Sequence, residues 1–167
     1  MINSKHCYII AEIGINHEGN INLACDLIKK AKKGGADAVK FQFFEAKTMA
    51  FKNSEKTKDQ KKRTHKKESL YEMWKRMELS FKDLVRLKKE AKKNKLDFIC
   101  SVFDINSLQI AKKIGLDSYK VASSDLTDVI LLKELSKEKK PIILSTGMAS
   151  LFEIEKALQI LKNRDVY

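Results

Sequence analysis

Short apolar runs alternate with stretches of helical periodicity along most of this chain. Each apolar run is bounded by Gly, Pro or polar turn residues, which predicts a buried strand. Between the runs, apolar residues recur three and four positions apart, as they do in amphipathic helices. The predicted strands are 8–13, 38–43, 97–101, 119–122 and 141–145.

Polar capping residues mark the starts of the predicted helices. Ser80 and Ser150 are each followed three positions later by an acidic residue, which is a capping-box pattern. Gly34 and Gly115 follow periodic segments and are expected to end them. The predicted first residues or caps are Asn20, Ser80, Asn106, Asp128 (for a helix over 129–137) and Ser150.

The segment 45–79 interrupts this pattern. Residues 52–67 hold eight Lys or Arg and two acidic residues without apolar periodicity, so we expect a long, exposed connection. Tyr71, Met73, Trp74 and Met77 then predict a short helix. Long connections inside compact domains are often functional lids, although a solvated insertion explains the composition equally well.

Five strand–helix repeats with nearly continuous apolar strands predict an α/β fold with a parallel sheet. The sheet can be an open doubly wound sheet or part of a (β/α)8 TIM-type barrel. No Gly-x-Gly-x-x-Gly follows the first strand, which argues against dinucleotide binding. A complete barrel needs roughly 250 residues, so residues 1–167 are expected to form one incomplete barrel domain of about five units. A sixth strand is expected to begin at 165–167.

Composition narrows the classes of partner. The net charge is +12, but it comes from 30 Lys and only 4 Arg, and no nucleic-acid-binding motif is present, so we expect no nucleic-acid partner. The three cysteines lack metal or disulfide spacing, as in a reducing cytoplasm. No run is long enough to span a bilayer, so we expect a cytoplasmic protein without a membrane partner.

Polar side chains stand at or just after the carboxyl end of every predicted strand, where parallel α/β folds place their sites. Lys40 and Lys120 are the two lysines within apolar runs, and a buried ammonium needs an anionic partner or solvent. We therefore predict a receptor for a small molecule that carries a phosphate and a carboxylate. Its candidate residues are Glu12, Lys40, Gln42, Ser101, Lys120, Ser123, Asp125 and Ser145.

A different enzyme class fits the same residues. A lysine in an apolar barrel strand is also the nucleophile of Schiff-base aldolases, where a neighbouring cation helps to lower its pKa. A non-catalytic half-barrel that serves as a binding or assembly module is a third reading. The residues by themselves do not separate these alternatives.

Four stretches of the chain resemble the sialic acid synthase family, which makes N-acetylneuraminate, legionaminate and pseudaminate. They are IAEIGINHEG at 10–19, GADAVKFQ at 35–42, KVAS at 120–123 with LT at 126–127, and KPIILSTGMA at 140–149. The resemblance implies a (β/α)8 barrel that condenses phosphoenolpyruvate with an N-acetylated hexosamine such as N-acetylmannosamine and releases phosphate. Full-length members are expected to form homodimers.

The resemblance also implies roles for the candidate residues. Lys40, Ser101, Lys120, Ser123 and Ser145 would hold phosphoenolpyruvate. Glu12, Gln42 and Asp125 would face the sugar or transfer protons, with Glu12 and Asp125 as the catalytic pair. A divalent metal, Mn²⁺ or Mg²⁺, would act as a Lewis acid on the sugar aldehyde.

The chain departs from the family pattern in several places. Val102 stands where the family has Pro after the third strand, and Ser124-Asp125 replaces the Gly-Glu of N-acetylneuraminate synthases, which leaves the sugar open. The resemblance places the metal-binding histidines on later strands and an antifreeze-like domain after them, so neither is expected within residues 1–167, and His6, His17 and His65 are not expected to replace those ligands. We expect His17 to form local hydrogen bonds, His6 and His65 to lie at the surface, and the 167-residue chain to be inactive or very weak alone.

Overall fold

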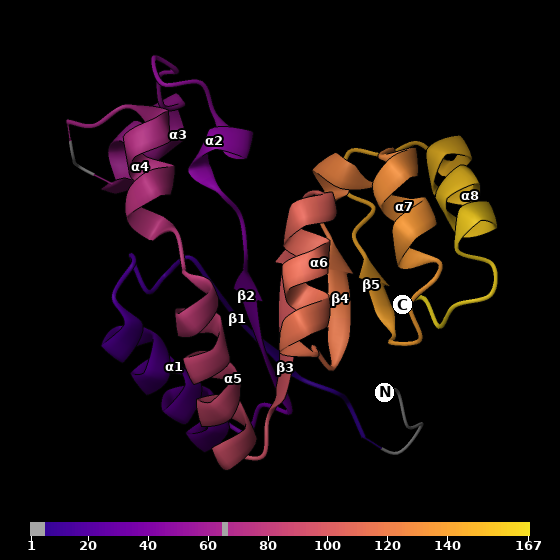
Figure 1. Cartoon of the computed structure of the whole chain (residues 1–167), viewed down its shortest axis with the longest axis horizontal. Coiled ribbons are helices and arrows are strands. Elements are labelled where there is room, and N and C mark those ends of the chain that lie inside the picture. Colours follow the sequence, from indigo (N-terminus) through magenta and orange to yellow (C-terminus); the bar gives the residue numbers. More distant parts are fainter. Residues whose placement is uncertain (1–5, 65–66) are drawn as a thin grey trace.

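The computed structural model describes residues 6–64 and 67–167, which form a parallel sheet whose strands are joined by helices (Figure 1). The strands are β1 Ile10–Gly14, β2 Ala38–Gln42, β3 Asp97–Val102, β4 Ser118–Val121 and β5 Ile142–Leu144. The helices are α1 Ile21–Lys33, α2 Ala46–Met49, α3 Lys58–Thr64, α4 Leu70–Met77, α5 Phe81–Lys93, α6 Ile105–Ile114, α7 Val129–Leu135 and α8 Leu151–Ile160, with a 3₁₀ turn, η1, at Ser123–Asp125.

The spatial order of the strands decides between the two predicted architectures. The order is β1-β2-β3-β4-β5, and every neighbouring pair is parallel. A doubly wound sheet reverses its strand order at a switch point, whereas a barrel keeps adding strands in the same direction. The chain therefore forms five successive units of a (β/α)-barrel type fold. Val166 forms a parallel bridge with Ile142, where the sixth strand was expected to begin.

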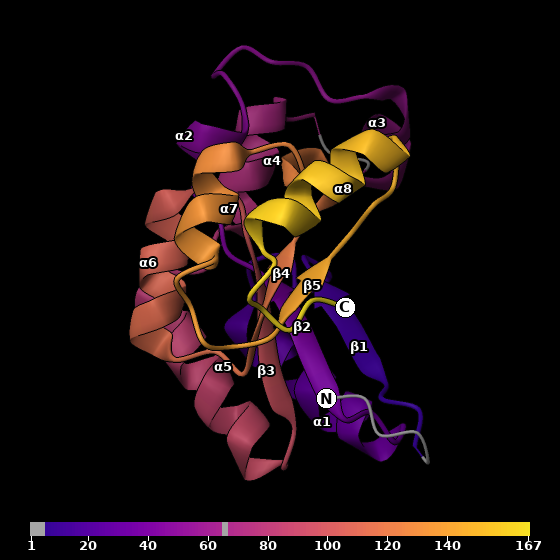
Figure 2. The same cartoon turned by 90° about the vertical axis from the view of Figure 1, so that its right-hand side faces the viewer.

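Side chains alternate between the two faces of the sheet. Val39 and Phe41 of β2, and Phe98 and Cys100 of β3, join the main core beneath the helices. The helices α1, α5, α6, α7 and α8 follow one another side by side on this face (Figure 2). Because the side-chain period of a strand is two, Lys40, Gln42 and their neighbours in register point to the opposite face.

The caps predicted for α1, α5, α7 and α8 are confirmed, because Asn20, Ser80, Asp128 and Ser150 each accept hydrogen bonds from first-turn amides. The prediction that Asn106 opens a helix was wrong. Asp104 caps α6 instead, since its carboxylate accepts the amide of Ser107.

Several boundaries also differ from the prediction. β1 begins at Ile10 and includes Gly14, β4 ends at Val121, β5 omits Pro141 and Ser145, and α7 ends at Leu135. At β4 the cause is local, because Ala122 starts the η1 turn instead of continuing the ladder. The apolar character of a residue does not reveal where its backbone leaves the sheet.

The segment 45–79 is more ordered than predicted. The predicted helix around Trp74 is confirmed as α4, which opens with a capping box at Ser69 and Glu72. The predicted exposure of 52–67 is largely confirmed for its described residues, but the segment also contains the helix α3, and Lys56 is only 5% exposed. Figure 1 shows α2, α3 and α4 grouped beyond the carboxyl end of β2, and we call this group the insert.

Candidate active site

The face of the sheet opposite the helices carries a row of polar side chains. Glu12 pairs in register with Lys40 across β1 and β2. One step further along, Gln42, Ser101 and Lys120 stand side by side on β2, β3 and β4. The alternation and register that the sequence encodes therefore place these groups close together near the carboxyl ends of the strands.

Lys40 is held by two neighbouring strands. It is 7% exposed, its Nζ lies 3.0 Å from Oε2 of Glu12, and it donates a 2.9 Å hydrogen bond to Oγ of Ser101. A buried ammonium is tolerated only with such partners. The bulge at Gly14 shapes this pair, because a Cβ at that position would lie 2.8 Å from the Glu12 carboxylate and φ is +53°.

Lys120 is a second, partly buried cation in the same row. Burial, and then the charge of Lys40, lower the pKa of Lys120 to about 8. Its Nζ donates to the carbonyl of Val121, and the carboxylates of Glu12 and Asp125 only partly offset the shift. Two ammonium groups that repel each other across a cavity form a site whose charge an anion would balance.

Seven of the eight predicted residues line one cavity of about 500 Å³. These are Glu12, Lys40, Gln42, Ser101, Lys120, Ser123 and Ser145. Ser123 reaches it because η1 turns the chain after β4, beside Gly147 of the loop after β5. The predicted clustering of the strand ends is thus present in the structure, and the role of each residue stays a prediction.

Asp125 lies in an adjoining cavity of about 340 Å³, which shares Met49 and Phe103 with the main cavity. Burial raises the pKa of Asp125 above its ordinary value. Ser124 donates a 3.1 Å hydrogen bond to Oδ1, whereas the buried Oδ2 has no hydrogen-bond partner within residues 6–64 and 67–167. This carboxyl group can therefore take up a proton more readily than an ordinary aspartate.

Three large apolar side chains of the main cavity were not predicted as site residues. Met49 comes from α2, Trp74 from α4 and Phe103 from the loop after β3. Trp74 was expected in a helix of a possible lid, but its direction depends on how the insert folds back over the strand ends. The single available signal was the position of Phe103, two residues after the third predicted strand.

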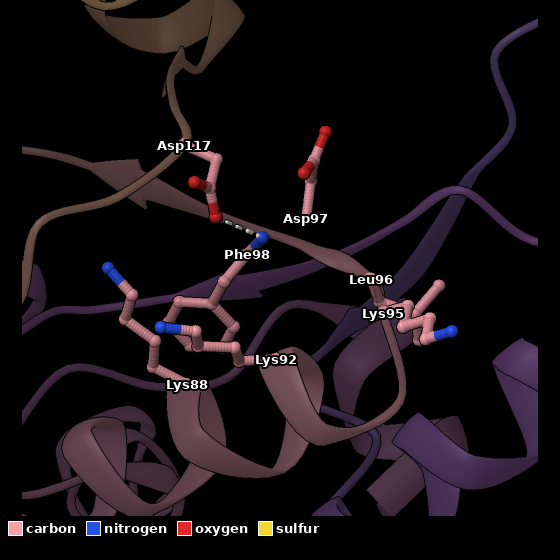
Figure 3. A pocket seen from close by; sticks show the side chains of 7 residues that line it. All are labelled: Lys88, Lys92, Lys95, Leu96, Asp97, Phe98 and Asp117. Carbon is pink, nitrogen blue, oxygen red and sulfur yellow. Dashed lines mark hydrogen bonds between the residues drawn. The ribbon is translucent and has the colours of Figure 1, made fainter.

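A second large cavity, of about 410 Å³, lies at the opposite end of β3 (Figure 3). Its polar groups form hydrogen bonds that connect elements of the fold. Lys88 donates to the carbonyl of Ile114 at the end of α6, Asp117 accepts the amide of Phe98, and Asp97 accepts the Tyr8 hydroxyl. Figure 3 shows Lys95 pointing away from Lys88 and Lys92, so the three lysines do not converge on one point.

No group of three His, Cys, Asp or Glu side chains within the described ranges could hold a metal ion. His17 is buried and its Nδ1 accepts the Gly19 amide at 3.0 Å, which confirms its predicted local role. His6 is exposed, as predicted, and bonds to Asp37, while His65 lies outside the described residues. The described helices include none that is long and apolar enough to cross a bilayer.

Two relatives with the same name match nearly the whole of this chain. The chain is 43% identical over 157 residues to the N,N'-diacetyllegionaminic acid synthase of Campylobacter jejuni, covering 94% of this chain and 47% of that protein. It is 39% identical to the enzyme of the same name from Legionella pneumophila, covering 95% of this chain and 45% of that protein. The chain thus spans about half the length of these relatives.

A solved structure agrees with the sequence comparison. The N-acetylneuraminic acid synthetase of Leptospira borgpetersenii superposes with a TM-score of 0.80 at 31% identity, over 95% of this chain and 52% of that one. Residues 27–166 match the NeuB family. The chain therefore belongs to the NeuB family, and the resemblance of its motifs to sialic acid synthases is confirmed.

Proposed function

We propose that this chain carries the phosphoenolpyruvate site of a synthase that condenses phosphoenolpyruvate with an N-acetylated hexosamine, forming a nonulosonic acid and releasing phosphate. The observation that carries the proposal is the cavity in which Lys40, Lys120, Ser101, Ser123 and Ser145 converge. Phosphoenolpyruvate presents a carboxylate and a phosphate a few ångströms apart, and two ammonium groups flanked by hydroxyls match that charge pattern.

The side chains of the cavity suit the steps of this condensation. C3 of phosphoenolpyruvate attacks the aldehyde carbon of the open-chain sugar, and the aldehyde oxygen takes a proton to become a hydroxyl group. Water then adds at C2 and loses a proton, and the tetrahedral intermediate expels phosphate. Lys40 and Lys120 hold the negative charges throughout, and Glu12 of the same cavity is placed to accept a proton. Asp125, whose pKa is raised by burial, lies in the adjoining cavity and is the proposed proton donor.

The described residues do not form a binding site for the divalent metal that the family resemblance implies. Within the described ranges no three potential ligands gather, and the Glu12 carboxylate is engaged by Lys40. We therefore assign no step to a metal. For the whole protein we propose a cytoplasmic homodimer whose remaining barrel units complete the site, so that the 167-residue chain binds phosphoenolpyruvate but turns over very slowly.

The acceptor is proposed from the names of the relatives. The synthases of Campylobacter jejuni and Legionella pneumophila are named for a product with two N-acetyl groups. Phosphoenolpyruvate has no nitrogen, so both acetamido groups must come from the sugar. A diacetamido hexose is therefore the acceptor that these two relatives favour, and N-acetylmannosamine is the alternative suggested by the name of the Leptospira borgpetersenii enzyme.

The lowered pKa of Lys120 favours a second candidate, a Schiff-base aldolase. A lysine that titrates near pH 8 is partly neutral at physiological pH and could attack a carbonyl group. Borohydride treatment with pyruvate would then leave a covalent adduct on Lys120. The condensing synthase predicts no adduct.

Phosphate release tests the proposed function directly. The chain is incubated with phosphoenolpyruvate, Mn²⁺ and N-acetylmannosamine, and inorganic phosphate is measured with and without the sugar. Slow, sugar-dependent release that is lost in Lys40→Met supports the proposal. A pyruvate adduct without sugar-dependent phosphate release would overturn it in favour of the aldolase.

A further inference from the structure

The residues that line the main cavity fall into two chemical groups. Charged and hydroxyl side chains come from the strand ends, whereas Met49, Trp74 and Phe103 pack on a small apolar cluster. We call these three residues the apolar wall. Phosphoenolpyruvate, with three carbons and two anionic groups, offers little to such a surface, so the wall has no use in the phosphoenolpyruvate site itself.

The wall is rigidly supported from behind. Phe44, 2% exposed, packs edge-on against Trp74, with ring centroids 4.9 Å apart, and against Phe103 at 6.3 Å. Met73 and Met77 of α4 complete this small core, which is separate from the main core under the helices. Aromatic rings held in this way have a fixed orientation, as a selective contact surface requires.

The insert that carries Trp74 is also fixed to the loop after β1. Arg76 lies 3.6 Å from Glu18 of that loop and 2.9 Å from Glu68. The backbone of Gly19 passes so close to α4 that a Cβ there would lie 2.1 Å from the Arg76 carbonyl oxygen, and its φ is +80°. This contact sets the distance of α4 from the strand ends, and thus the position of the wall.

We propose that Met49, Trp74 and Phe103 select the acceptor sugar by packing against the methyl group of an acetamido substituent. This inference rests on the proposed function, since it names the part of the same cavity that receives the second substrate. An acetamido group combines a methyl group, which an aromatic wall favours, with an amide that Gln42 or Glu12 on the polar side can bind. A hydroxyl group in its place leaves the wall without a partner.

The chain has a built-in reporter for this contact, because Trp74 is its one tryptophan. Tryptophan fluorescence is recorded while N-acetylmannosamine, or mannose with a hydroxyl in place of the acetamido group, is titrated in the presence of phosphoenolpyruvate. We expect N-acetylmannosamine to bind at least about tenfold more tightly than mannose. Calorimetry measures phosphoenolpyruvate binding separately in the same protein.

Two variants localise the effect. Phe103→Ala removes part of the wall, and Gly19→Ala displaces α4 without altering a cavity residue. Each is expected to weaken N-acetylmannosamine binding about tenfold while phosphoenolpyruvate affinity changes less than about twofold. Phe51→Ala, in the same insert but 88% exposed, is the matched control and should change neither affinity.

The outcomes separate this inference from the proposed function. Equal affinity for the two sugars, no binding of N-acetylmannosamine, or an equal loss of both substrates in Phe103→Ala overturns the selecting role of the wall. If phosphoenolpyruvate does not bind but the preference for the acetamido sugar is intact, the proposed function is overturned and the selecting role of the apolar wall is supported.

Discussion

At the scale of single residues, the site depends on the partners of a buried cation, Lys40, and of a partly buried one, Lys120. Lys40 has a carboxylate and a hydroxyl as partners, whereas Lys120 has a backbone carbonyl and a repelling neighbour. The first ammonium is therefore balanced within the protein. The second remains to be balanced by an anionic ligand.

The hydrogen bond from Lys40 to Ser101 should contribute measurably to stability. Ser101→Ala leaves a buried ammonium with one partner fewer, and we expect the free energy of unfolding to fall by about 1–3 kcal/mol in chemical denaturation. Ser136→Ala, which removes an exposed hydrogen bond, should cost less than about 0.5 kcal/mol. Equal losses in the two variants would show that Lys40 does not depend on Ser101.

The lowered pKa of Lys120 predicts a pH dependence of ligand binding. The ammonium is charged below about pH 8 and neutral above it, while a phosphate monoester is already fully ionised above about pH 7. Phosphoenolpyruvate affinity should therefore be highest below pH 8 and fall by up to about tenfold per pH unit above it.

Variants identify the titrating group. Calorimetric titrations between pH 7 and 9.5 should show the fall in wild type and in Lys113→Met, which alters an exposed lysine of α6. In Lys120→Met the affinity should be low and nearly independent of pH. A wild-type affinity that stays constant across this range contradicts the assignment.

At the scale of elements, helix caps and strand identities could be predicted because they depend on neighbouring residues. Ser80 with Asp83, and Ser150 with Glu153, are local patterns and gave correct helix starts. The clustering of Lys40, Gln42 and Ser101 followed from strand alternation and parallel pairing. These features need no knowledge of distant contacts.

Two of the features that were missed are local, namely the Asp104 cap of α6 and the η1 turn, and the others depend on more distant contacts. Lys56 lies in a highly charged stretch, and its burial arises from Glu68, twelve positions later, and from Thr64. The separation of Asp125 from Ser123 arises from a 3₁₀ turn that no residue type specifies. The direction of Trp74 follows from packing on Phe44.

The insert should depend on Glu68. Its carboxylate accepts two hydrogen bonds from Arg76, lies 3.6 Å from Lys56, and is 13% exposed. The hydrogen bond from Arg76 lowers the pKa of Glu68, so this stabilisation is present at neutral pH and is lost as pH falls through the lowered value. Glu68→Gln removes the carboxylate that Arg76 and Lys56 share and should destabilise the insert by about 3 kcal/mol.

Hydrogen exchange measures this effect locally. Glu68→Gln should accelerate amide exchange in α4 and leave α5 and the strands unchanged. Glu55→Gln is the control, because Glu55 is 81% exposed and solvent screens its pair with Lys61. Unchanged exchange in α4 of the Glu68 variant would show that apolar packing alone holds the insert.

At the scale of the whole molecule, five βα units bring five strand ends to one cavity, and the insert covers part of it. The net charge of +12 is spread over the chain, whereas Lys40 and Lys120 line the same cavity. A general attraction for anions and a specific site can therefore be distinguished by substitution. Removing any exposed lysine changes the net charge equally but leaves the cavity intact.

The central claim, that this cavity binds phosphoenolpyruvate, is tested most directly by calorimetric titration of the chain at pH 7.5. We predict one saturable site that is lost in Lys40→Met, with at least about a hundredfold drop in affinity, and is retained in Lys113→Met. No binding, or an equal loss of affinity in the two variants, would contradict the claim.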